Sequence, residues 1–258
     1  LLSSTELIRV KPRDVIRLNS VSVEFIKTNH SIADSVAIAV HTPLGVVLHT
    51  GDFKIDYTPI DGELMDFARF AELGKKGVLA MMADSTNVEK QGYTKSERIV
   101  GESLTRIFGK TKGRIIIATF ASNIHRIQQI IDAATVYGRK VAVSGRSMEN
   151  IINVAIELGY IEVAENTLVP IDAINKYNND QIVIITTGSQ GEPMSALSRM
   201  ASAEHKKVNI VEGDTIIISA TPIPGNEKLV SKIVNQLFKK GAEVIYGSSE
   251  NIHVSGHA

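Results

Sequence analysis

The residues best suited to chemistry lie near position 50, where the apolar run Val46-Val47-Leu48 ends in Gly51-Asp52. An aspartate after a strand can be a metal ligand or a base, although Gly and Asp are also common turn residues. His30 directly follows another predicted strand. Imidazole nitrogen and carboxylate oxygen together suit zinc or manganese. The two residues therefore form a candidate metal site.

Two more imidazoles, His253 and His257, lie in a loop of small residues after the last predicted strand. They are candidates for the same site. Structural roles are expected for His41 at a hairpin turn and for His125 and His205 on amphipathic helices. His49 is predicted either to support the metal ligands or to belong to the core.

Composition excludes several classes of protein. The chain has 258 residues, 43% of them hydrophobic, enough for one large or two smaller domains. Its formal net charge of zero gives no general attraction to nucleic acid or membrane. The absence of cysteine excludes thiolate metal sites, disulfides and a thiol nucleophile, and suits a cytoplasmic location. No apolar run approaches the roughly 20 residues that span a bilayer.

The first part of the chain predicts an antiparallel sheet. Alternating apolar residues and a Pro-Gly turn indicate strands between residues 6 and 53. These strands are predicted over 7–10, 15–18, 21–25, 36–40 and 46–49. A helix over 64–73 then precedes a short buried strand over 77–82, which ends just before Asp84.

From about Lys95 short apolar strands alternate with amphipathic helices. Strands are predicted over 114–118, 140–143, 182–185, 215–218 and 243–246, and helices over 124–137, 148–158, 194–203 and 228–238. This order predicts an α/β fold with a parallel sheet covered on both faces. Ligands of such sheets bind at the carboxyl ends of the strands.

Those strand ends are rich in Ser, Gly, Thr and Asn. The five loops are 119–123, 144–147, 187–193, 219–227 and 247–251. One such loop is ordinary helix capping. Five on one edge, two of them beside Arg126 and Arg146, favour a phosphate-bearing ligand. Because no dinucleotide fingerprint or Walker loop is present, a phosphate chain is favoured over a simple nucleotide cofactor.

A series of short motifs runs from end to end of the chain. They are Thr28-Asn29-His30-Ser31, His49-Thr50-Gly51-Asp52-Phe53-Lys54, Ala83-Asp84-Ser85-Thr86-Asn87, Phe120-Ala121-Ser122-Asn123-Ile124-His125-Arg126, Gly145-Arg146-Ser147-Met148-Glu149-Asn150, Thr187-Gly188-Ser189-Gln190-Gly191-Glu192-Pro193, Pro222-Ile223-Pro224-Gly225-Asn226-Glu227 and His253-Val254-Ser255-Gly256-His257. In sequence and in order these motifs resemble ribonuclease J, a bacterial nuclease family with a metallo-β-lactamase fold and a β-CASP domain.

The resemblance implies a partial metallo-β-lactamase αββα domain over 1–94 and a β-CASP domain over 95–258. It also implies roles for single residues. His30 would be a metal ligand, and Asp52 would bridge two metals. Asp84 and His257 would assist proton chemistry beside the metals. The residues implied to contact RNA or its phosphates are Phe120, Ser122, Asn123, Arg126, His253, Ser255 and Gly256.

The chain also departs from the family pattern. The main metal motif, His-x-His-x-Asp-His, does not occur in these residues, and the family's last β-CASP histidine and C-terminal domain are not matched. Together with the lack of an initial Met, this predicts an excerpt from the middle of an enzyme. With only two ligands, the excerpt alone is expected to be inactive and to hold metal weakly or not at all.

For the intact parent, the resemblance implies RNA hydrolysis assisted by two divalent ions, zinc or manganese, with both 5′-3′ exonuclease and endonuclease action. The implied partners are single-stranded RNA with a 5′-monophosphate end and further copies of the enzyme, with no membrane. One alternative is an RNA-binding or interaction module without activity. Another is hydrolysis of a small molecule such as a lactam, which the second domain with its phosphate-friendly loops disfavours.

Overall fold

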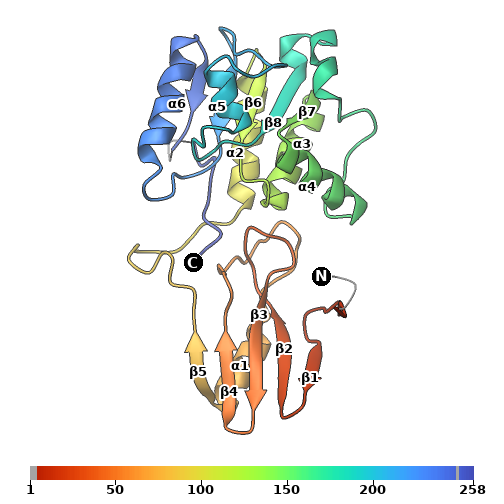
Figure 1. Ribbon diagram of the computed structural model, residues 1–258, viewed down its shortest axis with the longest axis vertical. Helices are drawn as coiled ribbons and strands as arrows, with labels where there is room; N and C mark the ends of the chain where they lie inside the picture. Colours follow the sequence, from red (N-terminus) through yellow and green to blue (C-terminus); the bar gives the residue numbers. More distant parts are fainter. Residues whose placement is uncertain (1–4, 248–249) are drawn as a thin grey trace. The chain divides into compact units, whose positions relative to one another are not determined.

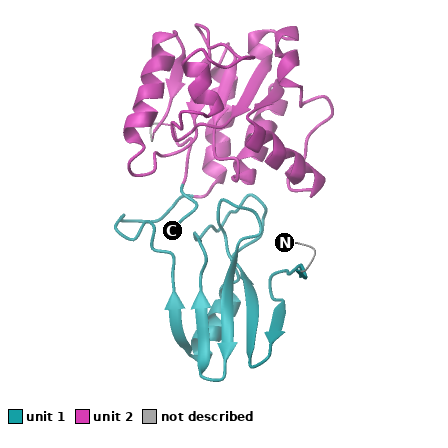
Figure 2. Ribbon diagram, viewed as in Figure 1, with its two compact units in different colours: residues 1–95, 255–258 teal, residues 96–254 magenta. Residues whose placement is uncertain are grey.

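The computed structural model describes residues 5–247 and 250–258, which form two compact units (Figure 2). Unit 1 comprises the described residues up to Lys95 together with Ser255–Ala258, and unit 2 comprises Ser96–Val254 without its two undescribed residues. The expected division assigned residues 255–258 to the second domain, whereas these residues pack with unit 1. Ser248 and Ser249 of the fifth polar loop lie outside the described residues.

Unit 1 is built on a five-stranded sheet in the order β1-β2-β3-β4-β5 (Figure 1). The strands are β1 (Val15–Leu18), β2 (Val21–Lys27), β3 (Val36–Thr42), β4 (Gly45–His49) and β5 (Val78–Met82). The first four pair antiparallel, as the alternation predicted, and β5 pairs parallel with β4. The strand expected over 7–10 is wrong, because these residues are irregular and mostly exposed.

Alternate residues of the sheet bury one face of unit 1. Ile26, Ala37, Ala39 and Leu48 pack with Leu73 of α1 (Phe67–Lys76). The Asp66 side chain caps this helix by accepting a hydrogen bond from the backbone N–H of Arg69. The expectation that β5 is buried is wrong: four of its five residues are exposed, because β5 is an edge strand and lies largely outside this core.

Unit 2 contains the expected parallel sheet, in the order β10-β9-β6-β8-β7. The strands are β6 (Ile115–Ala118), β7 (Lys140–Ser144), β8 (Ile182–Thr186), β9 (Thr215–Ile218) and β10 (Glu243–Ile245). The three central strands, β6, β8 and β9, are completely buried. Parallel strands covered on both faces read as continuous apolar runs, as they do here.

Helices cover both faces of this sheet. Ile115 and Ile117 of β6 pack with the apolar faces of α2, α3 and α4, whereas Ile116 and Ala118 pack with α5 and α6. The helices are α2 (Arg98–Lys110), α3 (Ile124–Val136), α4 (Arg146–Glu157), α5 (Ala196–Ala201) and α6 (Glu227–Lys239), with short 3-10 turns at Ile171–Lys176 and Asn179–Gln181. The α/β fold class is confirmed.

Among residues 5–247 and 250–258, none of the helices combines the length and the apolar character needed to cross a bilayer.

His205 makes the stability of unit 2 sensitive to pH. Burial lowers the pKa of His205, and the nearby cations Arg199 and Lys207 lower it further. The ring also needs its neutral form, because Nδ1 accepts the backbone N–H groups of Lys207 and Val208 at 3.3 and 3.1 Å. Nε2 lies 3.0 Å from the hydroxyl of Ser144, to which it donates.

Because the unfolded chain takes up this proton more readily than the folded one, stability should fall as the pH drops below about 6.5, the ordinary pKa of histidine. The contribution of one such group reaches at most about 1.4 kcal/mol per pH unit. Urea unfolding between pH 8 and pH 5 should show a steeper loss for the wild type than for His205→Asn. Parallel losses in both proteins would contradict this role.

Candidate metal centre

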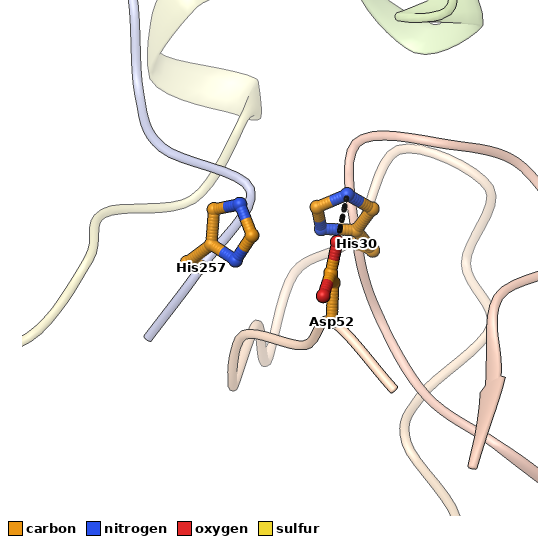
Figure 3. A group of neighbouring side chains, drawn as sticks. All are labelled: His30, Asp52 and His257. Atoms are coloured by element: carbon orange, nitrogen blue, oxygen red, sulfur yellow. Dashed lines mark ion pairs between the residues drawn. The ribbon is translucent and has the colours of Figure 1, made fainter. Parts of the chain in front are cut away.

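Three side chains of unit 1 converge into one cluster: His30, Asp52 and His257 (Figure 3). Each offers one ligand atom, and these atoms lie within 4.8 Å of one another. Nε2 of His30 is 3.9 Å from Oδ2 of Asp52. The two imidazole rings meet edge to face, with centroids 5.0 Å apart. Residues far apart in sequence thus form one site of two nitrogens and one oxygen.

Asn29 fixes the chain next to His30, just after β2 ends. Its side chain accepts the backbone N–H of Met65 at 3.1 Å and donates to the carbonyl of Glu63 at 2.7 Å. Its own carbonyl accepts the N–H of Lys54 at 2.8 Å. Asn29 is buried, so these bonds are shielded from water. The position of the His30 backbone is therefore determined by two other segments of unit 1, at residue 54 and at residues 63–65.

A sharp turn after β4 presents Asp52. Gly51 has a φ of +62°, and a Cβ added there would lie 2.9 Å from the carbonyl oxygen of Val36. Only glycine can adopt this positive φ and lie so close to the Val36 carbonyl without strain. His49, which is exposed and not part of the core, accepts the N–H of Gly51 on its Nδ1 at 3.0 Å. The carboxylate of Asp52 is 65% exposed, so its oxygens are open to a ligand.

Asp84 holds the imidazole of His257. Its Oδ2 lies 2.6 Å from Nδ1 of His257 and also accepts the N–H of Phe53 at 3.2 Å. Its Oδ1 accepts the N–H and hydroxyl of Thr86 at 2.9 and 2.6 Å. Burial alone would raise the pKa of Asp84, but the hydrogen bonds from Thr86, His257 and Phe53 outweigh it and hold the pKa well below its usual value. Asp84 is therefore an ionised acceptor.

These bonds also determine which nitrogen of each ring is available. The Nδ1 proton of His257 is held by a carboxylate, and Nδ1 of His30 lies 2.7 Å from the carbonyl of Gly256, which can only accept. Each ring therefore keeps the lone pair on Nε2, and in His30 the Ser31 hydroxyl lies 3.5 Å from this atom. A ring held by an oxygen at one nitrogen and binding metal through the other is the usual arrangement of histidine ligands. The donors present fit a zinc or manganese ion.

The structure brings His30 and Asp52 together, as expected, and places His257 beside them. From residue type alone, His257 was a candidate for the same site, whereas the family resemblance assigned it, with Asp84, to proton chemistry. The small-residue loop around it was a usable signal. That the His257 loop lies beside the end of β2 could not be predicted from the sequence. Its position depends on tertiary contacts of the last residues, such as the hydrogen bond from the Ala258 N–H to the carbonyl of Phe53 at 2.8 Å.

Arg126 requires a correction. It was expected in a groove for the RNA strand, but its side chain is completely buried in unit 2. Nε and Nη2 bind the two carboxylate oxygens of Glu97 at 2.7 and 2.8 Å, and Nη1 donates to the carbonyl of Ser219 at 2.9 Å. The guanidinium N–H groups of Arg126 thus donate to groups inside unit 2. Arg126 therefore organises the fold and is not placed to grip a strand.

The other residues expected to contact RNA differ in accessibility. Asn123 is buried, and its side chain caps α3 by accepting the N–H of Arg126. Ser122 is exposed and Phe120 is half-buried, so both are reachable from solvent. His253 accepts a hydrogen bond from Nη1 of Arg126 on its Nδ1 at 2.7 Å. Within this set, Ser122 is exposed, and Phe120 and His253 are both half-buried.

Ser255 and Gly256 shape the loop that carries His257. The Ser255 hydroxyl accepts the N–H of His257 at 3.0 Å and an amide hydrogen of Asn87 at 3.1 Å. Gly256 packs directly on the His30 ring: an added Cβ would lie 2.7 Å from two ring atoms and 2.7 Å from the Ser31 hydroxyl. Both residues, expected to hold a phosphate, also position the two histidines.

This close approach gives a test of the cluster. In Gly256→Ala the new methyl group should push the His30 ring away and weaken its bond to the Gly256 carbonyl. Loss of such a supporting contact typically weakens metal affinity about 10- to 100-fold. Calorimetric titration of the 258-residue chain with Mn²⁺ should show this loss, whereas Gly74→Ala in α1, where nothing lies within 4 Å of the added carbon, should bind as the wild type does. Equal affinities in both variants would show that Gly256 does not position His30.

Residues 112–237, within unit 2, match the family model described as Ribonuclease J, beta-CASP domain. This part of the chain is thus similar to β-CASP domains of the ribonuclease J type.

The whole chain is similar to proteins named ribonuclease J. It is 51% identical to Ribonuclease J of Synechocystis sp., covering 100% of this chain and 40% of that protein. It is 44% identical to Ribonuclease J of Thermus thermophilus, covering 96% of this chain and 44% of that protein. With Ribonuclease J2 of Bacillus subtilis it shares 45% identity over 98% of this chain and 45% of that protein. The resemblance to ribonuclease J is confirmed, and the chain spans less than half the length of these relatives.

The fold also occurs in a solved structure. A crystal structure of a protein of unknown function from Enterococcus faecalis matches with a TM-score of 0.70 and 19% sequence identity. The match covers 99% of this chain and 57% of that one. It supports the architecture alone.

Proposed function

We propose that this chain supplies part of the active site of a metal-dependent ribonuclease. The observation that carries the proposal is the cluster of His30, Asp52 and His257, with Asp84 bound to His257. The similarity to proteins named ribonuclease J gives the reaction class, hydrolysis of RNA phosphodiesters. Because the chain spans only part of those relatives, the activity is proposed for a protein that contains all the family's metal ligands.

Each residue of the cluster has a proposed role. His30 and Asp52 would hold divalent metal, zinc or manganese. Bound ions of this kind supply Lewis acidity that activates water and stabilises charge on phosphorus. His257 accepts a proton at Nε2, because Asp84 keeps the other ring proton at Nδ1. Asp84 also stabilises the imidazolium that this transfer creates.

The proposed substrate is single-stranded RNA in the cytoplasm, cut internally or from a 5′-monophosphate end. Ser255 and Gly256 lie next to His257 in the loop that would approach such an end. His253, at the start of the same loop, is proposed to assist through its ring Nε2. Cleavage would leave 5′-phosphates on the products, and assembly into homo-oligomers is expected.

A chimera tests this proposal. The 258 residues replace the matching segment of Synechocystis ribonuclease J, to which they are 51% identical, so that the remaining ligands are supplied. The chimera should release 5′-phosphorylated products from a labelled RNA with Mn²⁺ or Zn²⁺ and lose this activity with a chelator. Metal-independent cleavage, or products with 5′-hydroxyl ends, would refute the proposed chemistry.

The 258-residue chain alone is expected to bind metal weakly and to leave RNA intact, because His30 and Asp52 are its two proposed metal ligands and a catalytic zinc site normally uses three from the protein. In this state it would act as an RNA-binding module. Turnover by the purified chain that disappears in Asp52→Ala would overturn this expectation.

A further inference from the structure

The hydroxyl of Thr50 joins two parts of the metal cluster. Thr50 follows β4 and precedes Asp52 by two residues. It is only 5% exposed, so its hydroxyl is shielded from bulk water. Oγ1 donates to the carbonyl of Gly51 at 2.8 Å and accepts the backbone N–H of Asp84 at 3.0 Å. One buried atom thus bonds both to the turn that presents Asp52 and to the residue that holds His257.

Backbone groups extend this connection between the ends of β4 and β5. The N–H of Thr50 donates to the carbonyl of Met82 at 3.0 Å. The N–H of Phe53, just after Asp52, donates to the carboxylate of Asp84 at 3.2 Å. Of the bonds that tie the turn to Asp84, the one made by the Thr50 hydroxyl can be removed without changing the charge or the shape of a side chain.

The proposed chemistry requires a fixed distance between these two parts. Asp52 would hold metal, and His257 would accept a proton at Nε2 while its Nδ1 lies 2.6 Å from Oδ2 of Asp84. Proton transfer needs hydrogen-bond reach, about 2.6–3.2 Å between heavy atoms. A displacement of about 1 Å can lower the rate about 100-fold. The position of Asp84 relative to the Asp52 turn should therefore limit the rate.

We propose that Thr50 is a positioning residue for metal-dependent hydrolysis, whose hydroxyl fixes the Asp52 turn relative to the Asp84–His257 pair. This role rests on the proposed function, because Thr50 acts through Asp52 and Asp84. Valine at this position keeps the volume and branching of threonine but leaves the N–H of Asp84 and the carbonyl of Gly51 without this partner. Buried groups that lose a partner are unfavourable, so both segments should shift.

Amide hydrogen exchange tests the role in the 258-residue chain without metal. The probe is the amide of Phe53, because its bond to the Asp84 carboxylate lengthens if Asp84 moves. In Thr50→Val its exchange rate should rise at least about tenfold. Thr50→Ser keeps the hydroxyl and should exchange as the wild type does. A larger increase in Thr50→Ser than in Thr50→Val would indicate packing by the methyl group and overturn the role of the hydroxyl.

Metal binding and catalysis give two further readouts. Thr50→Val should raise the Mn²⁺ concentration that broadens the imidazole NMR signals of His30 and His257 about 10- to 100-fold, the usual loss when a group that supports a ligand is removed. In the chimera, Thr50→Val should lower the rate of product formation at saturating Mn²⁺ at least about tenfold. Thr50→Ser should restore both values to those of the wild type.

Thr186→Val is the matched control. Thr186 is the last residue of β8, is completely buried and, like Thr50, donates its hydroxyl to the carbonyl of the next residue, at 3.3 Å. Because it lies in unit 2 and makes no contact with the metal cluster among the hydrogen bonds of the described residues, all three readouts should stay at their wild-type values.

The outcomes separate Thr50 from the proposed function. The role of Thr50 is overturned if Thr50→Val keeps the wild-type exchange rate at Phe53 or the wild-type rate of hydrolysis, or if Thr186→Val has equal effects. A wild-type chimera that releases no 5′-phosphorylated product would instead refute the proposed function. The exchange rate at Phe53 would still show whether the Thr50 hydroxyl holds Asp84 in place.

Discussion

Asp52→Asn is expected to lower RNA hydrolysis by the chimera more than about 100-fold, since loss of a mere supporting contact to a ligand already reduces metal affinity or activity about 10- to 100-fold. Asparagine keeps the size of the side chain and suits the turn after Gly51, but it removes the negative charge of the proposed metal ligand. The rate of 5′-phosphorylated product formation at saturating Mn²⁺ measures the effect, and thermal unfolding checks that the fold is intact.

Glu63→Gln is the matched control for this variant. Glu63 is exposed in unit 1, and the carboxylate makes no hydrogen bond or ion pair within the described residues, so the same charge is lost without touching the cluster. The control should keep wild-type activity. An Asp52→Asn chimera as active as Glu63→Gln would exclude Asp52 from the metal centre.

Arg126→Met is expected to lower the free energy of unfolding of unit 2 by about 3–5 kcal/mol, the range measured when one partner of a buried ion pair is removed. The buried Glu97 carboxylate would lose its bidentate guanidinium, and the carbonyl of Ser219 would lose a donor. Methionine fills much of the same volume, so the lost charge and hydrogen bonds dominate. Urea unfolding followed by circular dichroism measures the change.

Two companion variants make this result specific. Adding Glu97→Gln to Arg126→Met removes the buried negative charge of Glu97, which Arg126→Met leaves without its arginine partner. The double variant should therefore recover part of the lost stability. Arg106→Met breaks an ion pair with Glu250 whose side chains are 52% and 42% exposed, and should change the stability by no more than about 1 kcal/mol. If both variants lost similar stability, breaking the buried Arg126–Glu97 pair would cost no more than breaking an exposed pair, which would contradict this prediction.

Much of the fold could be predicted because it follows from local pattern. The alternation of apolar and polar residues predicted the hairpins of unit 1. Short apolar runs between amphipathic helices predicted the parallel sheet of unit 2. Helix α2 was missed although its signal is present: Val100, Leu104, Ile107 and Phe108 recur at helical spacing and are buried. Two internal glycines weaken that signal. The exposure of β5 could not be foreseen, since its apolar composition is that of a buried strand.

The site was predictable in part. His30 and Asp52 both follow strands whose ends lie near each other in an antiparallel sheet, so residue type and position indicated their meeting. Arg126 could not be assigned correctly from the sequence, because its partner Glu97 is joined to it only by tertiary structure.

The most direct test of the metal centre is a titration of the 258-residue chain with paramagnetic Mn²⁺, followed through the imidazole NMR signals. The signals of His30 and His257 should broaden together at the lowest metal concentrations, and Asp52→Asn should abolish the effect. His41, at the opposite end of the β3–β4 hairpin, should broaden last within unit 1. Broadening of His41 before His30 and His257, or an unchanged response in Asp52→Asn, would contradict a shared metal site.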